Sequence, residues 1–170
     1  SERLTRSFGY AFSIAKARED HSIFSPPLLG TEFFRDFDQR HTVALNGNYR
    51  VSSSWHLHVS WRFHTGNPTT DLEHTAVELS DGSLFCERHF GDLNADRLPA
   101  YHSLDLRFTK TSPHRNWQLT WYIQVLNLYS RLNIHERAFS KRRDEGTNAV
   151  IGCDVSDEPL FPIVPTLGVS

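Results

Sequence analysis

The stretch Trp55-His-Leu-His-Val-Ser-Trp-Arg-Phe-His64 alternates apolar and polar residues at every position. Since successive side chains of a β-strand point to opposite faces, this period predicts a strand with two chemically different sides. The apolar side carries Trp55, Leu57, Val59, Trp61 and Phe63. The polar side carries His56, His58, Ser60, Arg62 and His64. Such a strand belongs in an antiparallel sheet whose two faces meet different surroundings.

Five further segments show the same alternation: residues 7–16, 42–51, 103–110, 117 onward and 163–170. Most of the six predicted strands are about ten residues long. A strand of a soluble protein usually has about five or six residues, whereas a tilted strand that crosses a membrane needs about 9–11. We therefore expect an all-β chain of long antiparallel strands, and the strand length favours a bilayer.

The predicted connections fall into two classes. Residues 52–54 and 111–116 form short turns, whereas the long polar connections cover residues 17–40, 65–100 and 139–160. Short turns at one end and long loops at the other are typical of an up-and-down transmembrane β-barrel, with the long loops outside. Four aromatic residues, Tyr49, Trp55, Phe108 and Trp117, would then gather near the periplasmic rim.

Composition excludes several other classes. The 170 residues carry 18 Lys and Arg against 20 Asp and Glu, which argues against a polybasic nucleic-acid binder. With 38% hydrophobic residues, including 12 Phe, the chain is too apolar to be a disordered tail. No segment approaches the roughly 18 consecutive apolar residues of a transmembrane helix. Membrane strands remain compatible, because their apolar residues come at every second position.

Five segments resemble, in their order along the chain, the C-terminal end of TonB-dependent outer-membrane receptors. They are Asp38-Gln-Arg-His41, Trp61-Arg-Phe-His-Thr-Gly-Asn-Pro68, Arg97-Leu-Pro-Ala-Tyr-His-Ser-Leu-Asp-Leu-Arg107, Val125-Leu-Asn-Leu-Tyr-Ser-Arg-Leu-Asn133 and Pro162-Ile-Val-Pro-Thr-Leu-Gly-Val-Ser170. The resemblance implies that residues 1–170 are part of a larger barrel of about 22 strands, of the size range known for such proteins. The family's plug domain, earlier strands and terminal aromatic residue are not in this sequence.

The same resemblance implies a function. The whole receptor would import a scarce ligand, such as an iron–siderophore complex, cobalamin or an oligosaccharide, across the bacterial cell outer membrane. Energy would arrive through TonB acting on the plug. The implied partners are the rest of the receptor, TonB, outer-membrane lipid and a small-molecule ligand. We expect no nucleic acid, no cofactor and no enzymatic activity.

The polar sides of two strands supply the candidate ligand-binding residues of the lumen: His56, His58, Arg62, His64, Asp105 and Arg107. Imidazoles at positions i and i+2 can bind a metal or an anionic ligand. The competing interpretation is a hydrated wall that pairs with plug carboxylates, because a metal site needs a convergent third group. We therefore predict no metal site. Asp105 and Arg107 would belong to a ladder of interior charges with neighbouring strands, including Arg50 and Arg62.

Cys86 and Cys153 both fall in long predicted outer loops, where an oxidising setting allows a disulfide. Whether the two loops lie close enough is left open by the sequence. The charged run of residues 141–145 is expected at a solvated loop tip, and His74, His89 and His102 in or beside one loop remain unassigned.

Two competing functions remain. One is a soluble all-β binding module, such as a carbohydrate-binding sandwich, in which the four tryptophans form a core or a sugar platform. The other is an outer-membrane hydrolase using Ser60 with His58, although no orienting third group is evident. The discriminating feature is whether the apolar sides face outward or pack in a closed interior.

Overall fold

The computed structural model describes residues 3–18, 30–80, 82 and 84–169, and all of its regular elements are strands. No helix occurs in these ranges, and accordingly none of the described segments is a helix able to cross a membrane. The strands are β1 (Leu4–Phe12), β2 (Lys16–Arg18), β3 (Glu32–Phe34), β4 (His41–Arg50), β5 (Trp55–His64), β6 (Pro68–Thr69), β7 (Leu72–Glu78), β8 (Leu84–Phe90), β9 (Asp96–Arg97), β10 (Tyr101–Pro113), β11 (Gln118–Leu126), β12 (Ile134–Arg143), β13 (Val150–Pro159) and β14 (Val164–Val169).

Six long strands form one sheet in the order β1-β4-β5-β10-β11-β14, and every neighbouring pair is antiparallel. The all-β, antiparallel class predicted from the alternation is therefore confirmed. Strand β5 covers residues 55–64 as expected, whereas β1 ends at Phe12 and not at residue 16. It ends early because the Ala15 amide donates to the side chain of Asp38 and not to a neighbouring strand. Residue 170, included in the last predicted strand, lies outside the described residues.

The register places apolar side chains opposite one another across the whole sheet. Phe8 of β1 pairs with Leu45 of β4, which pairs with Trp61 of β5, and Trp61 pairs with Leu104 of β10. The same holds on the far side, where Phe108 pairs with Ile123 and Ile123 with Leu167. Because the period of a strand is two, the remaining residues form the opposite face, which is mainly polar on β4, β5 and β10.

The apolar face is uncovered within the described ranges. The buried apolar side chains there are Cys86, Leu98 and Cys153, and none of them belongs to the six-stranded sheet. Phe8 keeps 69% of its surface exposed and Leu167 keeps 79%. The apolar residues of β5 are partly exposed, shielded by strand neighbours and not by a second layer.

Aromatic side chains gather into two belts on the apolar face. The lower belt, at the short-turn end, joins Trp55 to Phe108 in a stack of 4.7 Å and to Trp121 edge-on at 5.1 Å. Lys110 lies 5.2 Å from the Trp55 ring in the same belt. The upper belt contains Tyr10, Phe12, His41, Trp61, Phe63, His102 and Tyr129.

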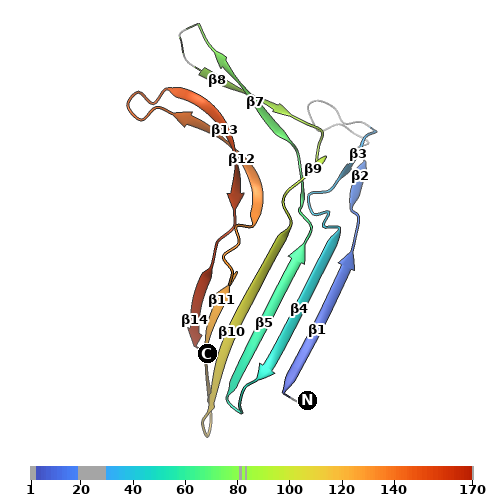
Figure 1. Ribbon diagram of the computed structural model, residues 1–170, viewed down its shortest axis with the longest axis vertical. Helices are drawn as coiled ribbons and strands as arrows, with labels where there is room; N and C mark the ends of the chain where they lie inside the picture. Colours follow the sequence, from blue (N-terminus) through green and yellow to red (C-terminus); the bar gives the residue numbers. More distant parts are fainter. Residues whose placement is uncertain (1–2, 19–29, 81, 83, 170) are drawn as a thin grey trace.

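The two ends of the sheet differ, as Figure 1 shows. Short turns lie at the lower end, where the chain also begins and ends, and all longer excursions rise from the upper end. These excursions are not irregular loops but antiparallel hairpins, formed by β2–β3, β7–β8 and β12–β13, with the short pair β6–β9 at their base. The last excursion begins with β12 at Ile134, five residues before the start of the long connection predicted for residues 139–160. In the first predicted long connection, residues 17–40, residues 19–29 lie outside the described residues.

Candidate functional site

The six lumen candidates lie together on the polar face of neighbouring strands. The register sets Arg107 opposite His58, and the position of Asp105 opposite Ser60. Arg62 Nη2 donates to Asp105 Oδ2 at 2.8 Å. The Arg107 guanidinium lies 3.7 Å from the centre of the Tyr122 ring. The structure thus brings His56, His58, Arg62, His64, Asp105 and Arg107 onto one wall.

Asp105 is the organising carboxylate of this wall. Its side chain is buried, and both carboxylate oxygens accept hydrogen bonds. Oδ1 accepts from Ser103 Oγ at 2.8 Å and from the Asn127 amide at 2.9 Å, and Oδ2 accepts from Arg62. A buried carboxylate that accepts three hydrogen bonds through both of its oxygens positions its neighbours and has little capacity left for a ligand. Of the two predicted charges on β10, Asp105 is thus held in a hydrogen-bond network, whereas the Arg107 guanidinium stacks on Tyr122.

The histidines do not converge. His58 Nδ1 is hydrogen bonded to Asn48 Oδ1 at 2.8 Å, and His64 Nδ1 donates to the carbonyl of Thr65 at 2.9 Å while its ring stacks on Tyr101. No group of three or more histidine, cysteine or acidic side chains that could hold a metal occurs among the described residues. These imidazoles are thus arranged as hydrogen-bonding wall residues.

A first buried junction closes the upper end of the sheet around Asp38. The Ala15 amide donates to its Oδ1 at 2.5 Å, Arg97 pairs with its Oδ2, and Arg40 Nε lies 3.6 Å away. Arg97 also donates to the carbonyl of Gly66 at 3.0 Å. Burial raises the pKa of Asp38, but the hydrogen bond from Ala15 and the Arg97 guanidinium lower it by more, and the pKa lies below its usual value.

A second junction holds the other side of the sheet. Asn127, at positive φ, donates from Nδ2 to the carbonyl of Arg131 at 2.8 Å and accepts from the Arg131 amide at 3.1 Å. Asn133 exchanges two hydrogen bonds with the backbone of His102. Four of the five quoted segments thus meet in these two junctions: Asp38, Gly66 and Arg97 in the first, and Asp105 with Asn127 in the second.

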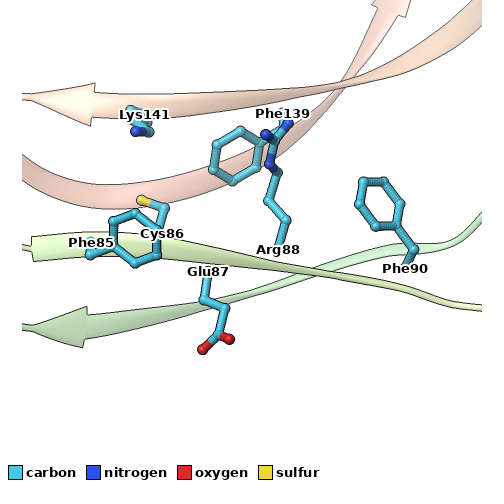
Figure 2. A pocket seen from close by; sticks show the side chains of 7 residues that line it. All are labelled: Phe85, Cys86, Glu87, Arg88, Phe90, Phe139 and Lys141. Atoms are coloured by element: carbon cyan, nitrogen blue, oxygen red, sulfur yellow. The ribbon is translucent and has the colours of Figure 1, made fainter. Parts of the chain in front are cut away.

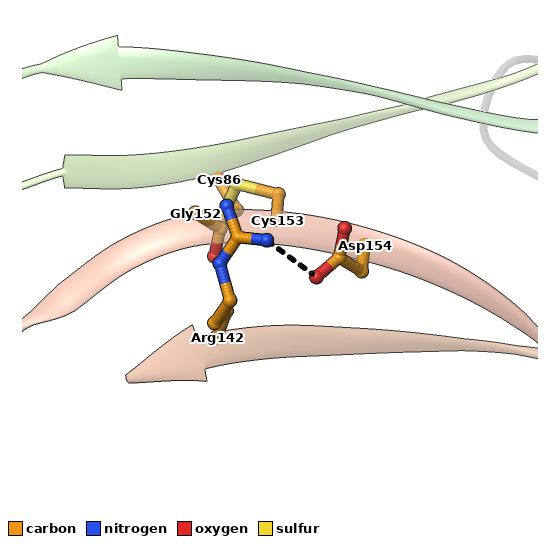
Figure 3. The surroundings of a disulfide bond; sticks show 5 residues. All are labelled: Cys86, Arg142, Gly152, Cys153 and Asp154. Carbon is orange, nitrogen blue, oxygen red and sulfur yellow. Dashed lines mark hydrogen bonds and ion pairs between the residues drawn. A yellow bond between two sulfur atoms is a disulfide. The ribbon is translucent and has the colours of Figure 1, made fainter. Parts of the chain in front are cut away.

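Above the junctions, the hairpins β7–β8 and β12–β13 form what we call the outer lobe. A disulfide between Cys86 of β8 and Cys153 of β13 joins them, so the pairing left open by the sequence is present (Figure 3). Arg142 lies beside this bond and pairs with Asp154 at 3.7 Å. At the base of the lobe, Arg137 pairs with Asp96 at 2.7 Å. The bond with Asp96 raises the pKa of Arg137, so this contact remains charged.

The outer lobe contains a hollow of about 700 Å³ between β8 and β12, here called the lobe hollow (Figure 2). Its lining consists of Phe85, Cys86, Glu87, Arg88, Phe90, Phe139 and Lys141. The Arg88 guanidinium lies 5.3 Å from the centre of the Phe139 ring. In Figure 2, Arg88 extends toward β12, whereas the Glu87 carboxylate points away from the hollow.

Sequence reasoning did not assign the lobe hollow or the buried role of Asp38. Lys141 is exposed near the end of β12, as expected for the charged run at a solvated tip, and it lies opposite Cys153. His102 belongs to the upper belt, where its Nδ1 is 2.6 Å from the hydroxyl of Tyr129. A signal for β7–β8 that sequence analysis did not use is Gly82, which lies at positive φ between the two strands.

Comparison with known proteins gives no further identification, because no family model, no curated protein and no solved structure matches the chain.

Proposed function

We propose that the chain forms the C-terminal part of the transmembrane barrel of a TonB-dependent outer-membrane receptor. The whole protein would import a scarce ligand, such as an iron–siderophore complex, cobalamin or an oligosaccharide, with energy coupled through TonB. One observation carries the proposal: a six-stranded antiparallel sheet with an uncovered apolar face between two aromatic belts and a hydrogen-bonded polar face behind it.

The dimensions of the apolar face fit a bilayer. At about 3.4 Å per residue, the eight steps from Trp55 in the lower belt to Phe63 in the upper belt span about 27 Å along the strand. With a tilt of about 40°, this gives a band of about 20 Å, comparable to the roughly 25 Å apolar band of outer-membrane barrels. Amphipathic rings such as Trp and Tyr favour the two membrane–water interfaces.

The edges of the sheet support membership in a larger barrel. Neither β1 nor β14 pairs on its outer side with another strand in the described part of the chain. Unpaired backbone groups cannot face hydrocarbon, so a membrane sheet must close on itself. The smallest bacterial barrels have eight strands, and further strands are therefore required between β14 and β1.

The soluble sandwich is the weaker alternative, because it needs a second layer over the tryptophan face. Within the described ranges, the outer hairpins extend beyond the sheet and do not fold over it (Figure 1). The hydrolase alternative needs a hydrogen bond between Ser60 and His58. Instead, Ser60 Oγ donates to Asn46 Oδ1, and His58 is hydrogen bonded to Asn48.

Tryptophan fluorescence tests the lipid contact directly. The full-length protein encoded by the gene is reconstituted in vesicles with brominated acyl chains, and Trp55, Trp61, Trp117 and Trp121 are replaced singly by Phe. We expect each replacement to remove part of the lipid-quenched emission. As a control, a tryptophan placed on the polar face by Asn46→Trp should be quenched by aqueous acrylamide and not by the lipid. If the brominated acyl chains do not quench the emission of the four native tryptophans, the membrane assignment is wrong.

Import is tested in cells. A strain that depends on the full-length gene is grown with iron–siderophore complexes, cobalamin or an oligosaccharide as the limiting nutrient, with and without TonB. We expect growth on one of these classes to require both the gene and TonB. If growth on all three nutrient classes is the same with and without the gene, the import proposal is wrong.

A further inference from the structure

We propose that the lobe hollow binds a flat organic anion of small-molecule size, such as an aromatic carboxylate. The site lies on the outer lobe, away from the wall of lumen candidates. Its volume of about 700 Å³ falls in the range of small-molecule sites, about 300–1,000 Å³. If the proposed function holds, this site would be the outward-facing one and would meet the imported ligand first. Binding in the hollow itself does not depend on that function.

The charge of the hollow is unbalanced. Arg88 and Lys141 line it, and neither has a carboxylate within ion-pair distance among the described residues. Two other cations of the lobe have carboxylate partners, since Arg137 pairs with Asp96 and Arg142 with Asp154. Glu87 is directed away from the hollow (Figure 2). Two unpaired cations facing one small volume favour an anionic occupant.

The remaining lining selects for a flat apolar body. Phe90, on the same side of β8 as Arg88, is 68% exposed, although it is a large apolar side chain that gains from being covered. The Phe139 ring already lies against the Arg88 guanidinium, an arrangement that leaves the planar fork free to hold a carboxylate with two parallel hydrogen bonds. A neutral aromatic ligand would cover the phenylalanine rings but leave the cations unpaired. A small inorganic anion would pair with the cations but leave the rings uncovered.

The disulfide fixes the distance between the two halves of the hollow. Lys141 of β12 lies directly opposite Cys153 of β13. Cys153 is bonded to Cys86, which precedes Arg88 by two positions and therefore points to the same side of β8. Reduction would free β8 from β13 and let the two cations separate. Binding should consequently depend on the oxidised state of this pair.

The test uses the full-length oxidised protein in detergent micelles, titrated calorimetrically with naphthalene-2-carboxylate. Arg88→Gln and Lys141→Gln should each raise the Kd about tenfold, the loss expected for a charge-assisted hydrogen bond. Lys16→Gln removes the same charge from a cation outside the lobe and should leave the Kd unchanged. The double substitution Cys86→Ser with Cys153→Ser should weaken binding as much as either cation variant.

Three outcomes would overturn the inference. One is equal affinity of the wild type and of a variant carrying both Arg88→Gln and Lys141→Gln. Another is binding of neutral naphthalene-2-methanol as tight as that of the carboxylate, and the third is binding of sulfate as tight as that of the carboxylate. Lipid quenching of the tryptophans is unaffected by these variants, so failure of the anion site and failure of the membrane proposal give separate readouts.

Discussion

Asp38 shows how a single residue connects distant parts of this chain. Carboxylates are seldom fully buried unless they are paired, and Asp38 has no exposed side-chain surface. Its partners are Ala15, in the link between β1 and β2, Arg97 of β9 and the nearby Arg40. One side chain therefore fixes how the first strand leaves the sheet and where the outer segments begin.

Replacing Asp38 by Asn should destabilise the protein by about 2 kcal/mol, because the charge-assisted bonds to Arg97 and Ala15 are lost or weakened. The folded pKa lies below the unfolded value, so the carboxylate stabilises the fold above about pH 4 and this contribution disappears as the pH falls through the folded pKa. Urea titrations in micelles should show a gap between wild type and variant at pH 7 that closes in acid. Asp92→Asn, an exposed change of the same charge, should show no gap at either pH.

Gly66 is a second position at which one added carbon atom would disturb the fold. A Cβ there would fall on the carbonyl oxygen of Leu98, which is backbone and cannot turn aside. Gly66→Ala should therefore cost roughly 3 kcal/mol or more and detach β6 from β9. Gly47→Ala is the matched control, since nothing lies within 4 Å of the added carbon. Thermal unfolding of both variants checks this, and equal midpoints would contradict the crowded junction.

At the scale of elements, alternation predicted the long strands and missed the hairpins for one physical reason. A strand between two different environments must alternate, as β5 does from Trp55 to His64. The hairpins β7–β8 and β12–β13 stand largely exposed on both sides, so nothing enforces a period of two in their sequences. Their pairing depends on turns and on the disulfide, which hydropathy does not reveal.

Two adjacent positions of β1 separate the possible surroundings of the sheet. Phe8 belongs to the apolar face and Ser7 to the polar face, at the same depth. If the apolar face meets lipid, Phe8→Arg should cost about 2–4 kcal/mol near the bilayer midplane, while Ser7→Arg costs little. The amount of heat-modifiable protein in outer-membrane fractions measures this difference. In a water-soluble protein the exposed Phe8 would tolerate Arg as well as Ser7 does, and equal yields would refute the lipid contact.

At the scale of the whole molecule, sequence reasoning could assign residues to faces but not to partners. All six lumen candidates share the polar wall, because the face of a residue follows from its parity along a strand. The predicted charge ladder of Asp105 with Arg62 is present, but that Lys141 and Arg88 line one hollow depends on contacts between segments far apart in sequence. Such contacts follow from register and from the disulfide, neither of which the period of one strand determines.

The open sheet predicts how the chain behaves alone. In the part of the chain that the structure describes, the sheet has an uncovered apolar face and two unpaired edges, which offer hydrophobic surface and backbone donors to any neighbour. A chain of these 170 residues should therefore associate in aqueous buffer and disperse in micelles, which sedimentation velocity would follow in both media. Phe8→Lys and Leu167→Lys, placed on the two exposed edge strands, should reduce association by adding charge where strands would add. A monomer that sediments as a compact particle in plain buffer would mean that the apolar face is sealed, and the barrel proposal would fall with it.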